Sequence, residues 1–172
     1  MSLTVPHKIW TTAGGKPYQV AKARIQLLLL SSQYPCAKLS RHWSSDNPMG
    51  ICSNTTCQDH QLVESPEHIL IHCPSYIAAR QHLVSLQYEL SDQVSQSLIT
   101  RHLFTEDMMQ LLLDCSALPM VIRAAQVHGP KIFSSIFYYS RTWCFSIHRS
   151  RMKRLNKWNF RWYFSKPYHL LS

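Results

Sequence analysis

Four residues between positions 51 and 80 have the types and the spacing of metal ligands. Cys52 and Cys57 lie in a short loop rich in Ser, Asn and Thr, and Cys73 comes five residues after His68. Two thiolates close together, followed by an imidazole and a third thiolate close together, are typical of a closed tetrahedral zinc site of the Cys3His type. We therefore predict a zinc knuckle over residues 51–80, with Zn²⁺ as its structural cofactor.

A helix start precedes the second pair of ligands. Ser65, Pro66 and Glu67 supply an N-cap, a proline for the first helical position and an acid for the first turn. This start places His68 on a short helix and Cys73 on the last turn of that helix. Both side chains can then turn back toward the loop.

Two alternatives are left open by the spacing. His60 and His72 lie close to the ligand pairs, and either could replace a ligand. His72 follows His68 by four residues, so the two share one face of the expected helix. Cysteine is also often a small buried hydrophobe, so six cysteines in the chain do not by themselves require a metal.

The segment E-S-P-E-H-I-L-I-H-C-P-S-Y-I-A-A-R, residues 64–80, resembles the zinc-binding segment that follows the reverse transcriptase domain in non-LTR retrotransposon polyproteins. In that family a pair of cysteines is followed by an E-H…C-P sequence and then by an Arg-containing helix. The family's ligand positions are occupied here by Cys52, Cys57, His68 and Cys73, and its accompanying positions by Glu67, Pro74 and Arg80.

The resemblance extends to both sides of this segment. Residues 16–34 and 39–44 are similar to the lead-in segment of animal retroelements of this kind, and residues 112–122 and 141–152 are similar to their C-terminal segment. The resemblance implies the C-terminal piece of a retroelement polyprotein without its polymerase. It implies RNA or DNA as the partner, either element RNA or target DNA, together with the polymerase portion of the parent polyprotein.

The positive charge of the chain lies in its last third. Residues 1–114 carry 8 Lys and Arg against 9 Asp and Glu, a net charge of −1, whereas residues 115–172 carry 10 Lys and Arg and no acid, a net charge of +10. Cations displace counterions from a phosphate backbone, and aromatic faces accept unstacked bases. The predicted nucleic-acid-binding residues are Arg149, Arg151, Lys153, Arg154, Lys157, Trp158, Arg161 and Trp162.

Hydrophobic periodicity predicts a mainly α fold, a small helical domain with the embedded zinc knuckle and a long basic C-terminal helix. We expect a flexible lead-in over residues 1–16 and a helical domain over residues 17–128. A long helix, apolar and then basic, follows over residues 129–158, and a basic aromatic tail occupies residues 159–172.

Two helices carry specific expectations. The apolar stripe of the long helix should run from Ile132 to Ile147 and then give way to a basic, solvent-exposed surface. A second helix should run from Ser75 to about Glu89 and carry Ile77 on its core stripe.

No catalytic set is visible in the sequence. The chain has no Gly-rich phosphate loop and no G-x-S-x-G motif, and it lacks the paired aspartates of a reverse transcriptase palm. We therefore expect a zinc-dependent nucleic-acid-binding module that is not an enzyme and has no small-molecule substrate. The alternatives are a helical protein–protein interaction domain with a structural zinc, and a retroelement relic without function.

The expected location is intracellular, and nuclear rather than cytoplasmic. The first residues have no apolar core of a signal peptide and contain several lysines. No stretch has the uninterrupted apolar length of a membrane span. Thiols stay reduced inside the cell, where a Cys/His cluster favours a metal over a disulfide.

Overall fold

The computed structural model describes residues 7–40, 46–81 and 105–155. In these ranges every regular element is helical, and one isolated antiparallel bridge joins Ile51 to Val63. The prediction of a mainly α fold is confirmed.

The longest helix, α9 (Lys131–Arg154), is the element against which the others pack. It contacts α2 (Pro17–Leu30), α5 (Ile77–Arg80), α7 (Thr105–Asp114) and α8 (Pro119–His128). The shorter elements are α1 (Lys8–Thr11), α3 (Ala37–Ser40), α4 (Thr55–Asp59), the π-helical turn η1 (His68–His72) and the 3-10 turns η2 (Pro74–Tyr76) and η3 (Cys115–Ala117).

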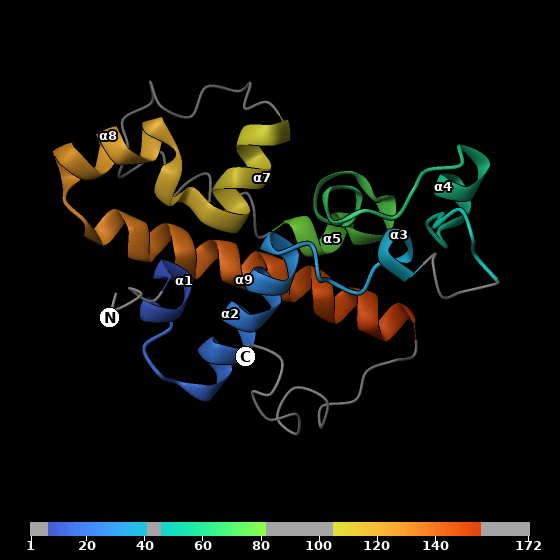
Figure 1. The fold of residues 1–172 in the computed structure, drawn as a ribbon, viewed down its shortest axis with the longest axis horizontal. Coiled ribbons are helices and arrows are strands. Elements are labelled where there is room, and N and C mark those ends of the chain that lie inside the picture. The colour runs from blue at the N-terminus through green and yellow to red at the C-terminus, as the bar shows by residue number, and fades with distance from the viewer. Residues whose placement is uncertain (1–6, 41–45, 82–104, 156–172) are drawn as a thin grey trace, which may run out of the picture.

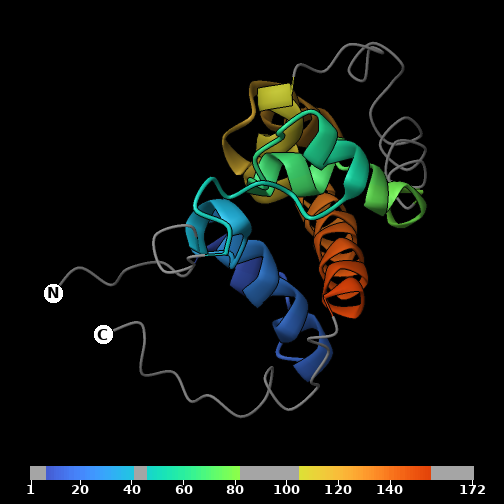
Figure 2. The same cartoon turned by 90° about the vertical axis from the view of Figure 1, so that its right-hand side faces the viewer.

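The helices are arranged around α9 in three groups. Figure 1 shows α7 and α8 on one side of α9, α1 and α2 on the other, and α3, α4 and α5 beside its C-terminal half. Figure 2 turns the molecule so that the α3–α5 group faces the viewer, with α9 behind it. The segment with the predicted ligands therefore lies next to the basic end of the long helix.

The apolar stripes predicted for the two longest helices form the core. In α9 the buried apolar residues are Ile132, Ile136, Phe137, Trp143, Cys144, Phe145 and Ile147. In α2 they are Ala21, Ala23, Ile25 and Leu29. Burial of such stripes supplies the main stabilising free energy of a helical domain of this size.

Two expectations about local structure are wrong. Part of the lead-in expected to be flexible forms α1, and Ile9 and Ala13 from this part are buried in the core. Ile77 is 64% exposed, whereas its neighbour Tyr76 is 1% exposed. The cause is the 3-10 turn η2, which precedes α5 and shifts the helical phase relative to a single helix that starts at Pro74.

Buried polar side chains donate hydrogen bonds to the backbone carbonyls in the last turn of α7. The Gln26 amide is fully buried and donates hydrogen bonds to the carbonyls of Leu112 (2.7 Å) and Leu113 (3.2 Å). The Ser140 hydroxyl on α9 donates to the carbonyl of Leu111 at 3.3 Å. Carbonyls in the last turn of a helix have no partner within the helix, so these two side chains remove the cost of burying that end.

Arg141 on α9 donates hydrogen bonds to the backbone carbonyls at the end of α1. Its guanidinium donates to the carbonyls of Ile9 (3.1 Å) and Thr12 (3.0 Å) and to the Thr12 hydroxyl (3.0 Å). Arg141 is only 2% exposed, and its burial lowers the pKa of the guanidinium. The three oxygen acceptors offset part of that desolvation cost and join the N-terminal segment to the central helix.

Among the described residues, no single helix has both the length and the apolar content needed to cross a membrane. One pair of segments, Asp107–Ala117 and Pro119–Val127, reaches those requirements only when taken together, and the two are bent by 49°.

We predict that Arg141→Met lowers the free energy of unfolding by about 3 kcal/mol, because the end of α1 loses hydrogen bonds from a charged donor while remaining buried. Chemical denaturation followed by circular dichroism measures the change. The matched control is Arg123→Met on α8, where the arginine is exposed, and we expect a change within about 0.5 kcal/mol. Equal effects of the two substitutions would contradict the capping role of Arg141.

Candidate metal centre

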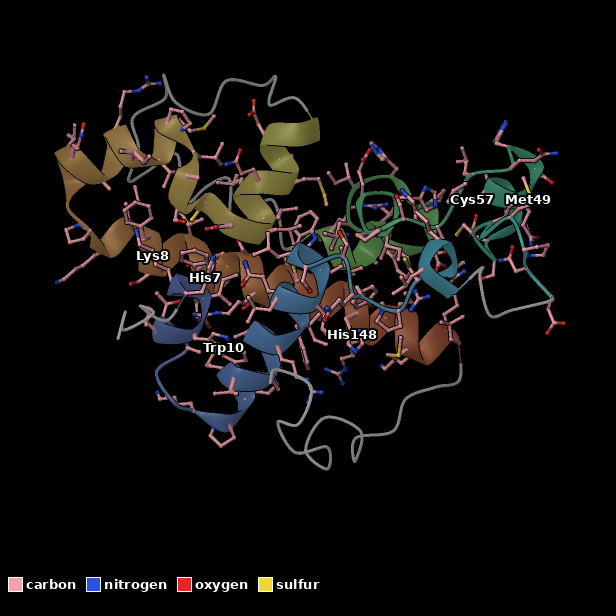
Figure 3. The ribbon with its side chains drawn as sticks, viewed as in Figure 1. His7, Lys8, Trp10, Met49, Cys57 and His148 are labelled. Atoms are coloured by element: carbon pink, nitrogen blue, oxygen red, sulfur yellow. The ribbon has the colours of Figure 1, made fainter. Side chains whose placement is uncertain are left out.

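Cys52, Cys57, His68 and Cys73 come together at one place in the fold. Their ligand atoms, three Sγ atoms and one imidazole nitrogen, all lie within 4.8 Å of one another. The three cysteines are 0% exposed and His68 is 7% exposed. Figure 3 shows Cys57 in the part of the molecule that holds α3, α4 and α5. The fold thus assembles the predicted ligands into a group that could hold a metal ion.

The first half of the centre is a tight loop that folds back on itself. The backbone N–H of Cys52 donates to the carbonyl of Leu62 at 2.9 Å, and the N–H of Leu62 donates to the carbonyl of Cys57 at 2.9 Å. The Asn54 side chain caps α4 by accepting from the N–H of Cys57. Its amide also donates to the Ser75 hydroxyl at 2.8 Å, which links this loop to the second half of the centre.

Gly50 allows this loop to approach α3. Its φ of +66° lies in the left-handed region that favours glycine, and a Cβ there would lie 2.9 Å from both the Ala37 carbonyl oxygen and the Lys38 Cα. Both contacts are with backbone atoms, so a side chain at position 50 would push the loop away from α3.

The second half begins with the predicted cap. The Ser65 hydroxyl accepts a hydrogen bond from the N–H of His68 at 3.1 Å, so the expected N-cap is confirmed. The helix widens into the π-helical turn η1, and the N–H of Cys73 donates to the carbonyl of His68 at 2.7 Å. The wider turn sets the spacing between these two ligands. Such π-turns occur frequently at functional sites.

Arg80 on α5 binds the C-terminal end of the π-helical turn η1. Its guanidinium donates to the carbonyls of Cys73 and Leu70. Arg80 is thus a local bridge between α5 and the last ligand, which gives a structural reason for an arginine at this distance from the Cys-Pro pair.

The three thiols hold their protons unequally. The Sγ atoms of Cys52 and Cys73 are 3.7 Å apart. A hydrogen bond from Cys52 lowers the pKa of Cys73 to about 5, and the same bond raises the pKa of Cys52. Burial raises the pKa of Cys57. One thiolate is therefore favoured in the cluster by itself, and a cation among the three would favour deprotonation of the other two.

The two alternative histidines lie outside the cluster. His72 is about half exposed, and its Nε2 atom lies 3.2 Å from Oε1 of Glu67. His60 is exposed at the end of α4. His68, in contrast, is buried, and its Nε2 atom has no hydrogen-bond partner. A buried imidazole nitrogen without a partner is costly unless a metal or another group satisfies it.

A buried carboxylate joins this loop to α9. Glu64 is 2% exposed, and its Oε1 accepts hydrogen bonds from Arg151 and from the backbone N–H of Ala37, the latter at 3.0 Å. Its Oε2 lies 3.5 Å from Nη2 of Arg154. The N–H of Glu64 donates to the carbonyl of Gly50 at 2.8 Å. The Glu64 carboxylate therefore contacts the start of α3 and the last turn of α9, and its backbone contacts the start of the ligand loop.

Two tyrosines complete this buried cluster. Arg154 donates to the Tyr76 hydroxyl at 2.7 Å and lies 5.3 Å from the centre of its ring, and burial raises the pKa of Tyr76 to about 12. The guanidinium of Arg151 lies 5.6 Å from the centre of the Tyr34 ring. Each guanidinium group thus lies over an aromatic ring.

The structure corrects the role predicted for Arg151 and gives Arg154 partners within the protein. Arg151 is 5% exposed and its partner is Glu64, so its guanidinium faces the interior rather than a phosphate in solvent. Arg154 is partly buried between Glu64 and Tyr76. The buried face of α9 does not end at Ile147, where the apolar stripe was expected to fade, because it continues as the buried polar side chains of His148 and Arg151.

The other predicted nucleic-acid residues have different positions. Arg149 and Lys153 are exposed on α9. The remaining four residues lie outside the described part of the chain: Lys157, Trp158, Arg161 and Trp162.

Sequence reasoning missed the Glu64 cluster, although one signal was present. His148 and Arg151 follow Cys144 at the helical spacing of the apolar stripe, so they continue a buried face. An arginine on a buried face needs an acidic partner. Glu64 is an acid within the ligand segment, and it stands between the apolar Val63 and the helix cap Ser65.

A scan against protein-family models and searches of curated proteins and of solved structures returned no match.

Below about pH 6.5 we expect His148 to make folding less favourable. Burial, with the nearby Arg151, lowers the pKa of His148 to about 3, and its Nδ1 lies 2.8 Å from the Tyr34 hydroxyl. Between these two pH values the unfolded chain binds a proton that the folded chain does not, so the free energy of unfolding decreases as pH falls.

His148→Asn keeps an acceptor for Tyr34 and removes this titration, so its stability should fall less steeply between about pH 6.5 and 3 than that of the wild type. Denaturant unfolding at a series of pH values, at equal metal content, measures the difference. His60→Asn, at an exposed position, is the control and should follow the wild type. Identical pH profiles for His148→Asn and the wild type would show that the imidazole is not held neutral.

Proposed function

We propose that Cys52, Cys57, His68 and Cys73 bind one structural Zn²⁺ and that the zinc-ordered helical fold serves as a nucleic-acid-binding module. The observation that carries the metal assignment is the convergence of four buried soft donors within 4.8 Å. Tetrahedral Zn–S bonds of about 2.3 Å place two sulfurs about 3.8 Å apart. The 3.7 Å between Sγ of Cys52 and Sγ of Cys73 fits this value.

The donor set favours a structural ion over a catalytic one. Three thiolates and one imidazole fill all four positions of a tetrahedral zinc, and a catalytic zinc keeps one position for water or substrate. The ion would join the loop of Cys52 and Cys57 to the π-helical turn of His68 and Cys73. The metal-binding free energy then contributes directly to folding of this segment.

Charge supports nucleic acid as the partner. The net charge of +10 after residue 114 includes Arg149 and Lys153, which are exposed on α9. Arg141 caps a helix and Arg151 forms a buried ion pair, so these two arginines do not contribute to the positive charge of the surface. An exposed face with cations and no acid fits an anionic backbone such as RNA or DNA.

The resemblance of residues 64–80 to retrotransposon polyproteins supports an origin as the C-terminal part of a reverse transcriptase protein. In that setting the module would bind element RNA or target DNA beside the polymerase portion. The contact of Arg80 with the carbonyl of Cys73 gives one position of the family pattern a role in the fold.

A second function, protein–protein interaction, is favoured by one surface feature. Met49, Leu62 and Val63 are 64%, 42% and 40% exposed and come from the two arms of the ligand loop. Exposed apolar side chains that are close together are common at protein interfaces.

We expect one zinc per chain after purification in reducing buffer. His68→Ala should lose the metal together with helical signal, because one of four ligands is removed from a site whose metal stabilises the fold. His72→Ala, four residues further along the same turn, should keep it. Elemental analysis and circular dichroism measure both. A folded wild type without bound metal, even when supplied with Zn²⁺, would disprove the site.

Neutralising Arg149 and Lys153 to Gln should weaken binding to RNA and DNA without changing the fold. Each cation that contacts a phosphate adds about 0.7 to 0.9 to the magnitude of the slope of log K against log salt. The magnitude of this slope should therefore be smaller by up to about 1.8 in the double variant. Fluorescence anisotropy over a salt series measures this slope. Arg123→Gln on α8 is the matched control. Absence of wild-type binding at about 50 mM salt would favour the protein-interaction alternative.

A further inference from the structure

Two exposed tyrosines lie against one buried ammonium group. Tyr18 on α2 is 53% exposed and Tyr138 on α9 is 46% exposed. The Nζ atom of Lys22 lies 4.7 Å from the centre of the Tyr18 ring and 5.6 Å from the centre of the Tyr138 ring. Two aromatic rings from different helices therefore share one cation, and both remain open to solvent.

Lys22 is held in place by neutral groups. It is 5% exposed and its ammonium donates to the Thr142 hydroxyl at 3.0 Å. Within the described ranges no carboxylate forms an ion pair with Lys22. The ring faces of Tyr18 and Tyr138 therefore supply much of the compensation for burying this charge.

Each tyrosine ring also packs against a second aromatic ring. Tyr18 meets Phe145 edge to face, with 5.4 Å between centroids, and Tyr138 meets Tyr139 in the same way at 5.3 Å. Rings fixed by both a cation and an aromatic edge lose little entropy when a ligand stacks on them. The pair is thus preorganised although about half of each side chain faces solvent.

Tyr138 lies on the basic face of α9. Helical spacings of seven and four residues place Lys131, Tyr138, Thr142, Arg149 and Lys153 on one side of this helix. The helix contains no Asp or Glu. At a rise of about 1.5 Å per residue, Arg149 lies about 16 Å along the helix from Tyr138.

We propose that Tyr18 and Tyr138 form a stacking site for unpaired bases of a single-stranded nucleic acid, whose phosphates follow α9 toward Arg149 and Lys153. This inference rests on the nucleic-acid-binding function proposed above and specifies the form of its ligand. Exposed aromatic faces beside cations bind bases with little sequence preference. In a duplex the base faces are covered by their neighbours, so only an unpaired strand can use both tyrosines.

The test compares the zinc-loaded protein and its variants on a labelled single strand of about 20 nucleotides, as RNA and as DNA, and on the matching duplex. Tyr18→Ala and Tyr138→Ala should each weaken single-strand binding by about tenfold. Because tyrosine is neutral, the salt slope should stay at the wild-type value. Tyr18→Phe and Tyr138→Phe should bind like the wild type, because they keep the ring.

Two controls separate stacking from loss of structure. Val127→Ala removes an exposed apolar side chain from α8 and should leave affinity unchanged. Zinc content and circular dichroism of both alanine variants should match the wild type. Duplex affinity should be weaker than single-strand affinity, and the double alanine variant should remove most of this difference.

Three outcomes would overturn the inference. Wild-type affinity in both alanine variants would show that the bases stack elsewhere while leaving the binding function intact. A loss that is equal for duplex and single strand would point to a general effect on the surface. A change of oligomeric state in the variants, seen by light scattering, would assign the tyrosines to contact with a second copy of the chain. Absence of any binding by the wild type would instead reject the proposed function on which the inference depends.

Discussion

The Glu64 carboxylate is the constraint on which the arrangement of the ligand segment depends. Its two oxygens contact Arg151, Arg154 and the start of α3, and its backbone pairs with Gly50 at the start of the ligand loop. A carboxylate that is 2% exposed is tolerated only with partners of this kind. The pairing therefore fixes where the loop sits on α9. A buried ion pair is weak support for net stability but strongly disfavours any arrangement that leaves one charge alone.

A metal at the cluster would extend this constraint. The pairing of Glu64 holds one end of the loop, and the four ligands would hold the loop to the π-helical turn that follows it. Tyr76 lies between the two, since it follows Cys73 closely and its hydroxyl accepts from Arg154. Binding of the ion and docking of the loop on α9 should accordingly be coupled, because each orders the same short segment.

Local pattern was sufficient to predict the four Cys and His residues that the fold brings together, the cap at Ser65 and the core stripe of α9. These features depend on residues close together in the chain, where ligand type, capping chemistry and helical period act directly. Arg151 was misassigned because its partner Glu64 is 87 positions away, and charge in a sequence does not show which side chains are buried. Long separations in sequence also hid the roles of Gln26 and Arg141, which cap helices through contacts 86 and 132 positions apart. Ile77 was misplaced for a different reason, a change of helical phase at a 3-10 turn.

The basic composition of the C-terminal third therefore has two separate physical roles. Arg141 and Arg151 are desolvated, and their charges are used to satisfy backbone carbonyls and a carboxylate. Arg149 and Lys153 stay at the surface of the same helix, two residues away from a buried arginine in each case. A helix with a period of 3.6 separates such neighbours by about 200°, so one sequence run can serve the interior and the surface together. The positive charge that α9 presents to solvent is consequently smaller than its sequence suggests, because Arg141 and Arg151 are used inside the protein.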